Sequence, residues 1–256
     1  METDAVEVVA SATKAEAGQR AAEDGAAILR ETITARGKAN IVVATGASQF
    51  EMLAALTQTW GIDWSCVTAF HLDEYLDLPA DHPASFRRYL RERFVERLPQ
   101  RLAAFHSIAP AGDGREECAR LGELIAAHPI DVAFIGVGEN GHLAFNDPPA
   151  QFDASDAFLV VELDEACRRQ QLGEGWFESL DAVPRRAITM SVPQILKSRS
   201  IICTVPERRK AEAVRAAVEG PVTSAVPASA LQQHVATTLY LDAESASLLS
   251  RATPNR

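Results

Sequence analysis

Residues Ile130 to Pro148 have the sequence I-D-V-A-F-I-G-V-G-E-N-G-H-L-A-F-N-D-P, which predicts a buried strand that ends in a glycine-rich turn. The apolar run 132–137 is typical of a strand covered on both faces. His142 follows the turn, and Asp147 lies five residues further on. In an open parallel α/β sheet, ligands bind just outside the carboxyl ends of the strands. The stretch therefore predicts either a ligand site with a titratable histidine or an ordinary turn, and alone it does not decide between them.

The rest of the chain alternates apolar, strand-like runs with segments of helical periodicity. This alternation predicts a single α/β domain over residues 1–256, Rossmann-like and three-layered, with a mainly parallel sheet. The polar segment 164–182 predicts either a small helical lid or a plain surface connection. We expect strands at 40–44, 66–72, 105–109, 132–137, 158–163, 186–192, 200–205 and 236–241, and helices at 12–36, 49–60, 86–98, 116–128, 194–197, 208–219 and 228–233.

Composition limits the classes of function. The net charge of -10 and the lack of a basic stripe disfavour nucleic acid and acidic membranes as partners. No run of about 18 apolar residues is present, so we expect no membrane span. The first ten residues, M-E-T-D-A-V-E-V-V-A, do not form a signal peptide pattern. The four cysteines are scattered without a C-x-x-C motif, so we expect reduced thiols and a cytoplasmic protein.

A small-residue turn, T-G-A-S at 45–48, follows the predicted strand 40–44. Ser48 and Glu51 have the spacing of a capping box, so we expect Ser48 to cap the helix that follows. The N-terminus of a helix offers free N–H groups and a partial positive charge, which together bind anions. The alternative is an ordinary capped turn, and the turn by itself favours that alternative.

Two further strand ends carry charged side chains. Asp73 and Glu74 directly follow the run 66–72, where a carboxylate is costly unless it is solvated or used, so a general base competes with a surface cap. Lys210 lies at the start of the helix 208–219, the end of a helix that prefers anions. It either contacts a bound anion or is simply exposed to solvent.

Together, an anion site, a strand-end carboxylate and a histidine with a nearby carboxylate indicate proton transfer on a phosphorylated small molecule. Histidine titrates close enough to neutrality to take up and release a proton. No second histidine or cysteine lies at ligand spacing from His142, so we expect no metal. Residues 136–141 match G-x-G-x-x-G, but Pro148 and Pro149 leave little room for the helix that a dinucleotide site needs.

On these residues the chain resembles the glucosamine-6-phosphate deaminase family, within the glucosamine-6-phosphate isomerase/6-phosphogluconolactonase superfamily. The resemblance implies isomerisation of an aldose to a ketose with loss of ammonia, giving fructose 6-phosphate from glucosamine 6-phosphate without a cofactor. It lies in four blocks in the family's order: 44–48 (A-T-G-A-S), 70–86 (with F-H-L-D-E-Y-L-D-L-P and D-H-P-A-S-F), 136–148 (G-V-G-E-N-G-H-L-A-F-N-D-P) and 210–220 (K-A-E-A-V-R-A-A-V-E-G).

The resemblance also implies roles for individual residues. Asp73 matches the base that moves a proton between the first two sugar carbons. His142 matches the residue that opens the sugar ring, and Asp147 the carboxylate that supports it. Asn140 matches a position where the family has Asp or Asn. The implied contacts to the substrate are Thr45, Gly46, Ala47, Ser48, Glu74, Gly138, Gly141, Arg168 and Lys210.

The chain departs from the family at several of these positions. Ala47 replaces a common glycine, and Asp147 replaces the usual glutamate. The predicted lid lacks the family's phosphate-binding arginine at 171–177, and we expect Arg168 or Arg169 to stand in for it. We therefore expect a small sugar phosphate as partner, and leave open the gluco or galacto epimer and a homo-oligomer. The alternatives are a 6-phosphogluconolactonase-like hydrolase, which shares the fold, and a non-catalytic module that senses sugar phosphates.

Overall fold

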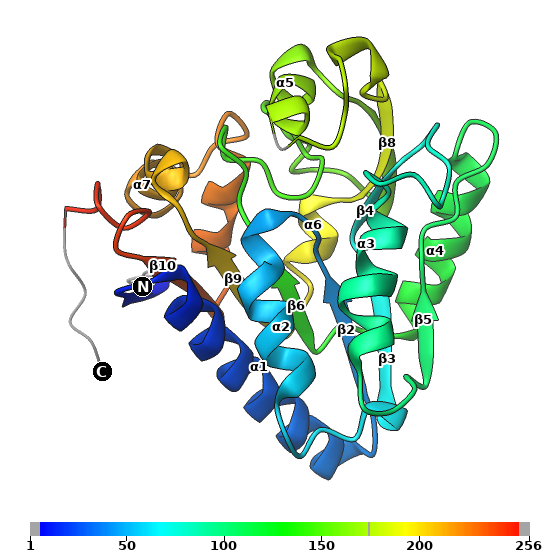
Figure 1. Ribbon diagram of the computed structural model, residues 1–256, viewed down its shortest axis with the longest axis vertical. Coiled ribbons are helices and arrows are strands. Elements are labelled where there is room, and N and C mark those ends of the chain that lie inside the picture. Colours follow the sequence, from blue (N-terminus) through cyan, green and yellow to red (C-terminus); the bar gives the residue numbers. More distant parts are fainter. Residues whose placement is uncertain (1–5, 174, 251–256) are drawn as a thin grey trace.

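A seven-stranded parallel sheet forms the centre of the computed structural model, which describes residues 6–173 and 175–250 (Figure 1). Its strand order is β1-β10-β9-β6-β2-β3-β5, which confirms the predicted α/β fold with a mainly parallel sheet. The bounds of its strands are β1 (Glu7–Ser11), β2 (Ala39–Val43), β3 (Val67–His71), β5 (Ala104–His106), β6 (Val132–Ile135), β9 (Ser200–Val205) and β10 (Thr237–Asp242).

Helices cover both faces of this sheet, which explains why its central strands are apolar throughout. Ile41 and Val43 of β2 pack into one core cluster, while Val42 and Ala44 pack into the cluster on the other face. The first face is covered by α1 (Lys14–Arg36), α2 (Phe50–Gln58) and α3 (Phe86–Arg93), and the second by α4 (Arg115–Ala127), α6 (Val192–Ile195) and α7 (Ala211–Glu219).

A small antiparallel sheet lies beside the carboxyl edge of the large one (Figure 1). It consists of β4 (Asp73–Tyr75), β8 (Arg186–Met190) and β7 (Phe158–Glu162). The sequence predicted β7 and β8 as strands but did not separate them from the main sheet. It missed β4 and the edge strand β1, because β4 has only three residues and begins with two carboxylates, so its pairing with β8 is set by tertiary structure.

The boundaries of α1 follow local signals, whereas those of α2 do not. Thr13 accepts a hydrogen bond from the Glu16 N–H (3.2 Å), and Gly37 ends α1 with a positive φ of 73°. The predicted cap by Ser48 is wrong, because Ser48 lies inside a 3-10 turn and makes no cap hydrogen bond. Its hydroxyl instead accepts a hydrogen bond from the side-chain amide of Gln49 (3.3 Å).

The site of ligand binding follows from the strand order. From β2 the chain proceeds through β3 to β5 on one side, while β6 is followed by β9 and β10 on the other. Adjacent strands whose connections leave in opposite directions open a crevice at their carboxyl ends. Here α5 (Glu165–Gly173), part of the predicted lid segment, lies over that edge (Figure 1). Within the described residues, no helix combines the length and the apolar character that a membrane crossing requires.

Two glycines provide a test of the packing between α1 and α2. A Cβ on Gly18 would lie 2.7 Å from Glu51 Cβ and 2.8 Å from the Met52 backbone nitrogen. We expect Gly18→Ala to lower the free energy of unfolding by about 1–3 kcal/mol, since this contact has no room for a methyl group. Urea denaturation measures the change.

Gly122→Ala is the matched control, because a Cβ there would have no neighbour within 4 Å. We expect it to raise the free energy of unfolding by about 0.5–1 kcal/mol through helix propensity alone. Equal effects of the two substitutions would contradict the close approach of α1 to α2.

Candidate active site

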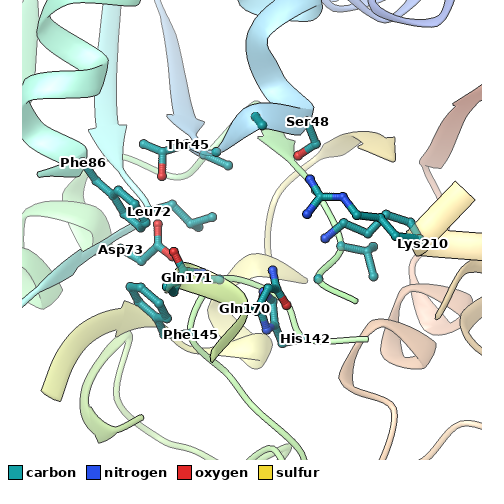
Figure 2. Close-up of a pocket in the computed structure, with 18 residues that line it drawn as sticks. Thr45, Ser48, Leu72, Asp73, Phe86, His142, Phe145, Gln170, Gln171 and Lys210 are labelled. Atoms are coloured by element: carbon teal, nitrogen blue, oxygen red, sulfur yellow. The ribbon is translucent and has the colours of Figure 1, made fainter. Parts of the chain in front are cut away.

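A pocket opens at the carboxyl edge, where the turns after β2, β3 and β6 meet α5 and the start of α7 (Figure 2). It contains eight of the predicted site residues: Thr45, Gly46, Ala47, Ser48, Asp73, Gly138, His142 and Lys210. The sequence did not single out the others as site residues, namely Ala44, Leu72, Phe86, Gly136, Val137, Ala144, Phe145, Gln170, Gln171 and Arg209.

Asp73 forms the polar group on one side of the pocket, beside Leu72, Phe86 and Phe145 (Figure 2). Its residue is only 6% exposed, and its Oδ1 has no hydrogen-bond partner among the described residues. Burial, reinforced by the charge of Glu74, raises the pKa of the Asp73 carboxyl group to about 8. A carboxylate with a raised pKa and a free oxygen is suited to act as a general base.

His142 is held by a side-chain network behind the pocket. Its Nδ1 lies 3.1 Å from Asp147 Oδ1, so the aspartate side chain is long enough to reach the ring. Asn140 completes the network: its Nδ2 donates to Asp147 Oδ1 (3.1 Å), and its Oδ1 accepts from the His142 N–H (3.1 Å). Asn140 and Asp147 therefore lie behind His142 and do not line the pocket.

The protonation of this pair follows from the state of Asp147. Burial alone would raise the pKa of its carboxyl group, but the hydrogen bond and charge of His142, with the Asn140 amide, hold that pKa below its usual value. An ionised carboxylate only accepts hydrogen bonds, so the proton between the two groups belongs to His142 Nδ1. In the neutral ring, Nε2 is then free to accept a proton.

Gly138 and Gly141 shape the backbone around the histidine. A Cβ on Gly138 would lie 2.2 Å from His142 Nε2, so the ring occupies the space that any other side chain would fill. Gly141 has a positive φ of 82° in the turn that leads into His142. It does not line the pocket, and its predicted contact with substrate stays a prediction.

Glu74, a predicted substrate contact, does not line the pocket. Successive side chains of a strand point in opposite directions, so Glu74 points away from the pocket that Asp73 faces. It is fully buried and accepts hydrogen bonds from the Ser85 hydroxyl (2.9 Å) and the Arg87 N–H and Nε (2.8 and 3.1 Å). Glu74 therefore anchors the start of α3.

Arg168, another predicted substrate contact, is also placed outside the pocket. Its Nε donates to the Val183 carbonyl (3.2 Å), and its Nη2 donates to the Leu180 carbonyl. These bonds use the guanidinium to hold the segment after α5, and the side chain does not line the pocket. Within the predicted lid 164–182, Glu174 lies outside the described residues.

The opposite side of the pocket carries small polar and cationic side chains. Ser48 and Lys210 lie there, away from Asp73 (Figure 2). The Tyr89 hydroxyl donates to the Gly46 carbonyl (2.9 Å), which fixes the turn after β2. Lys210 is 5% exposed, lines the pocket and immediately precedes α7, whose N-terminus carries a partial positive charge.

One group of side chains is compact enough to hold a metal ion. Ligand atoms of His142, Asp147 and Cys167 lie within 4.8 Å of one another. The histidine nitrogen and the carboxylate oxygen of this group are, however, the pair that already bonds His142 in place. We therefore assign the group to the support of His142, and the expectation that the protein uses no metal or cofactor stays a prediction.

Comparison with known proteins gives one family over most of the chain. The sequence model of the glucosamine-6-phosphate isomerases/6-phosphogluconolactonase family matches residues 12–240. A glucosamine-6-phosphate deaminase from Bacillus cytotoxicus is 34% identical over 93% of this chain and 88% of its own length. One from Streptococcus pneumoniae is 35% identical over 88% of this chain and 92% of its own length.

Solved structures agree with these matches. A monomeric glucosamine-6-phosphate deaminase is 33% identical, with a TM-score of 0.85 over 94% of this chain and 99% of that one. A 6-phosphogluconolactonase from Shewanella baltica has a TM-score of 0.76 over 93% of this chain and 97% of that one. At 23% identity, the second likeness shows the fold alone.

The raised pKa of Asp73 predicts how stability depends on pH. Between about pH 4, the pKa of an aspartate in an unfolded chain, and pH 8, the folded protein holds a proton that the unfolded chain has released. The contribution of Asp73 to the free energy of unfolding therefore falls as pH rises, by at most about 1.4 kcal/mol per unit, and levels off above pH 8.

Urea denaturation of Asp73→Asn at pH 5, 6, 7, 8 and 9 measures this effect. We expect the stability of the variant, relative to the unsubstituted protein, to increase with pH up to about 8. Asp77→Asn is the control, since it removes an exposed carboxylate that pairs with Arg186 (3.0 Å), a surface contact that contributes little at any pH. A difference for Asp73→Asn that does not change with pH would contradict the raised pKa.

Proposed function

The chain belongs to the glucosamine-6-phosphate isomerase/6-phosphogluconolactonase family, and we propose that it converts glucosamine 6-phosphate and water to fructose 6-phosphate and ammonia. The observation that carries this proposal is the placement of Asp73, a buried base with a free oxygen, across one pocket from an anion site. A sugar phosphate has its reacting carbons at one end and its phosphate at the other, so it matches this separation.

The first step that we propose is ring opening at His142. Nε2 takes the proton of the hydroxyl on carbon 1 and delivers a proton to the ring oxygen. The bond between carbon 1 and the ring oxygen breaks, which gives the open-chain aldehyde. Asp147 and Asn140 hold the imidazole in the tautomer that this transfer needs. Both residues act through His142 and are positioning residues.

The second step uses Asp73. Its ionised carboxylate removes the proton from carbon 2, while the aldehyde oxygen gains a proton that the ammonium group on carbon 2 loses, which gives an enol. Asp73 then returns its proton to carbon 1, so that carbon 1 carries an alcohol and carbon 2 carries a protonated imine. Water then adds to the imine, and ammonia leaves to give the ketone of fructose 6-phosphate. The apolar side chains Leu72, Phe86 and Phe145 limit access of water to the carboxylate during the transfer.

The substrate itself would ionise this base. Glucosamine 6-phosphate carries an ammonium group on carbon 2, and a positive charge within a few ångströms favours an ionised carboxylate. The pKa of the Asp73 carboxyl group, which burial raises to about 8, should therefore fall when substrate binds. The proposed mechanism thus couples the active form of the base to the presence of an amino sugar.

The activity is tested by incubating the purified protein with glucosamine 6-phosphate and measuring ammonia. We expect release of ammonia with formation of fructose 6-phosphate, and a loss of at least 10³-fold in kcat for Asp73→Asn, since the variant cannot accept the carbon proton. Asp77→Asn serves as the control and should keep its activity. Hydrolysis of 6-phosphogluconolactone without ammonia release would contradict the proposal in favour of a lactonase, and binding without either reaction would favour a sensor.

The pH dependence of the reaction tests the coupling to substrate. We expect kcat/KM, which reports the free enzyme, to rise with pH and level off near pH 8. The profile of kcat reports the substrate complex and should level off at a lower pH, because the ammonium group of the substrate favours ionised Asp73. Identical midpoints for the two profiles would show that substrate does not shift this pKa.

A further inference from the structure

A phosphate monoester carries a charge of about -1.5 to -2 near neutral pH, and the arginine expected beside Lys210 does not line the pocket. Arg168 is bonded to backbone carbonyls of its own segment. Arg169 pairs with Glu165 (2.5 Å) on an exposed surface of α5 and does not line the pocket. Among the described residues that line the pocket, the cationic side chains are Arg209 and Lys210.

Arg209 reaches the pocket from the 3-10 turn before α7, and two carboxylates hold its guanidinium there. Nη1 donates to Glu139 Oε1 (2.8 Å), and Nε donates to Glu207 Oε2 (2.8 Å). The side chains of Arg209 and Glu139 are each 38% exposed, so their ion pair is solvated. An ion pair in this setting is worth about 1 kcal/mol or less and is easily exchanged.

We propose that Arg209 is the second cation of the phosphate site and takes the place of a lid arginine in this chain. On binding, Nη1 exchanges the Glu139 carboxylate for a phosphate oxygen, while Nε stays on Glu207. A charge-assisted hydrogen bond from a guanidinium nitrogen to a phosphate oxygen is a stronger contact than the solvated surface pair that Nη1 leaves. This inference depends on the proposed function only for the presence of a phosphate group on the ligand.

The anchor for this exchange is Glu207. Its N–H donates to both carboxylate oxygens of Asp242 (3.2 and 3.1 Å), and its backbone has a positive φ of 82°. A non-glycine residue with this φ is held there by its surroundings. Glu207 is therefore fixed in the backbone and can keep the Arg209 guanidinium in place when Glu139 is released.

The first test compares Arg209→Gln with Arg208→Gln, using inorganic phosphate as the ligand and isothermal titration calorimetry. Both substitutions remove one positive charge at neighbouring positions, but Arg208 bonds to the Ser247 hydroxyl (2.6 Å) and does not line the pocket. We expect the Kd for phosphate to rise about tenfold in Arg209→Gln and less than twofold in Arg208→Gln. Equal changes in the two variants would overturn the assignment.

Glu139→Gln provides an opposite effect. It removes the carboxylate that competes for Nη1, so we expect the Kd for phosphate to fall two- to fivefold. In the double variant with Arg209→Gln this gain should disappear, because the two residues act as one unit. A gain that persists in the double variant would mean that Glu139 acts by simple repulsion of the anion, and would count against the exchange.

The enzyme assay separates this inference from the proposed function. We expect Arg209→Gln to raise KM for glucosamine 6-phosphate about tenfold with little change in kcat, since the contact is far from the reacting carbons. Arg209→Lys should recover part of this loss through its charge. If the unsubstituted protein released no ammonia, the proposed function would fail, and the phosphate titrations of the two arginine variants would still decide the role of Arg209.

Discussion

The strands β2 and β6 lie parallel and side by side at the centre of the sheet, with Ile41 opposite Val132 and Val43 opposite Phe134. This pairing extends one residue further, because the Ala44 N–H donates to the Phe134 carbonyl (2.9 Å). Both strands therefore end at the same edge of the sheet, which brings the T-G-A-S turn after β2 beside the glycine-rich turn after β6 that leads to His142. The buried amide of Gln49 joins this edge together, since its Nε2 donates to the carbonyls of Ile135 and Thr204 (3.2 and 3.4 Å).

The division of labour in the pocket follows from these strand ends. Asp73 begins β4, where strand geometry sends it to the pocket and sends Glu74 into the anchor of α3. Burial of the Asp73 carboxylate without a hydrogen-bond partner for Oδ1 destabilises the folded protein. The same burial raises the pKa of this carboxyl group, so the destabilisation grows as the group ionises. The anion site is placed across the pocket, so one substrate molecule can satisfy both sides at once.

The sequence predicted those parts of the structure that depend on local pattern. Buried strands are continuous apolar runs, so eight of the ten strands, all except β1 and β4, lie where a strand was expected. The residues that deliver chemistry to strand ends, Asp73 and His142, were also identified, because their position relative to the strands fixes their place in space. Assignment of their reaction required the resemblance to a family.

Where the structure differs from what the sequence suggests, a tertiary contact is the cause. Ser48 has the spacing of a cap, but Gln49 bonds across to β6 and β9 and draws the turn into a 3-10 conformation. Arg168 has the charge for a phosphate contact, but the carbonyls of Val183 and Leu180 take its guanidinium. The sequence did not distinguish Arg209 from the other two basic residues at 208–210, because only the path of the chain before α7 directs it into the pocket.

A crystal structure with glucosamine 6-phosphate reduced at carbon 1, which keeps the sugar chain open and unreactive, tests the central claim most directly. The account predicts carbon 2 beside the free oxygen of Asp73 and the phosphate against the T-G-A-S turn and Lys210, whereas a phosphate bound beside Asp73, or carbon 2 turned away from it, would contradict the account.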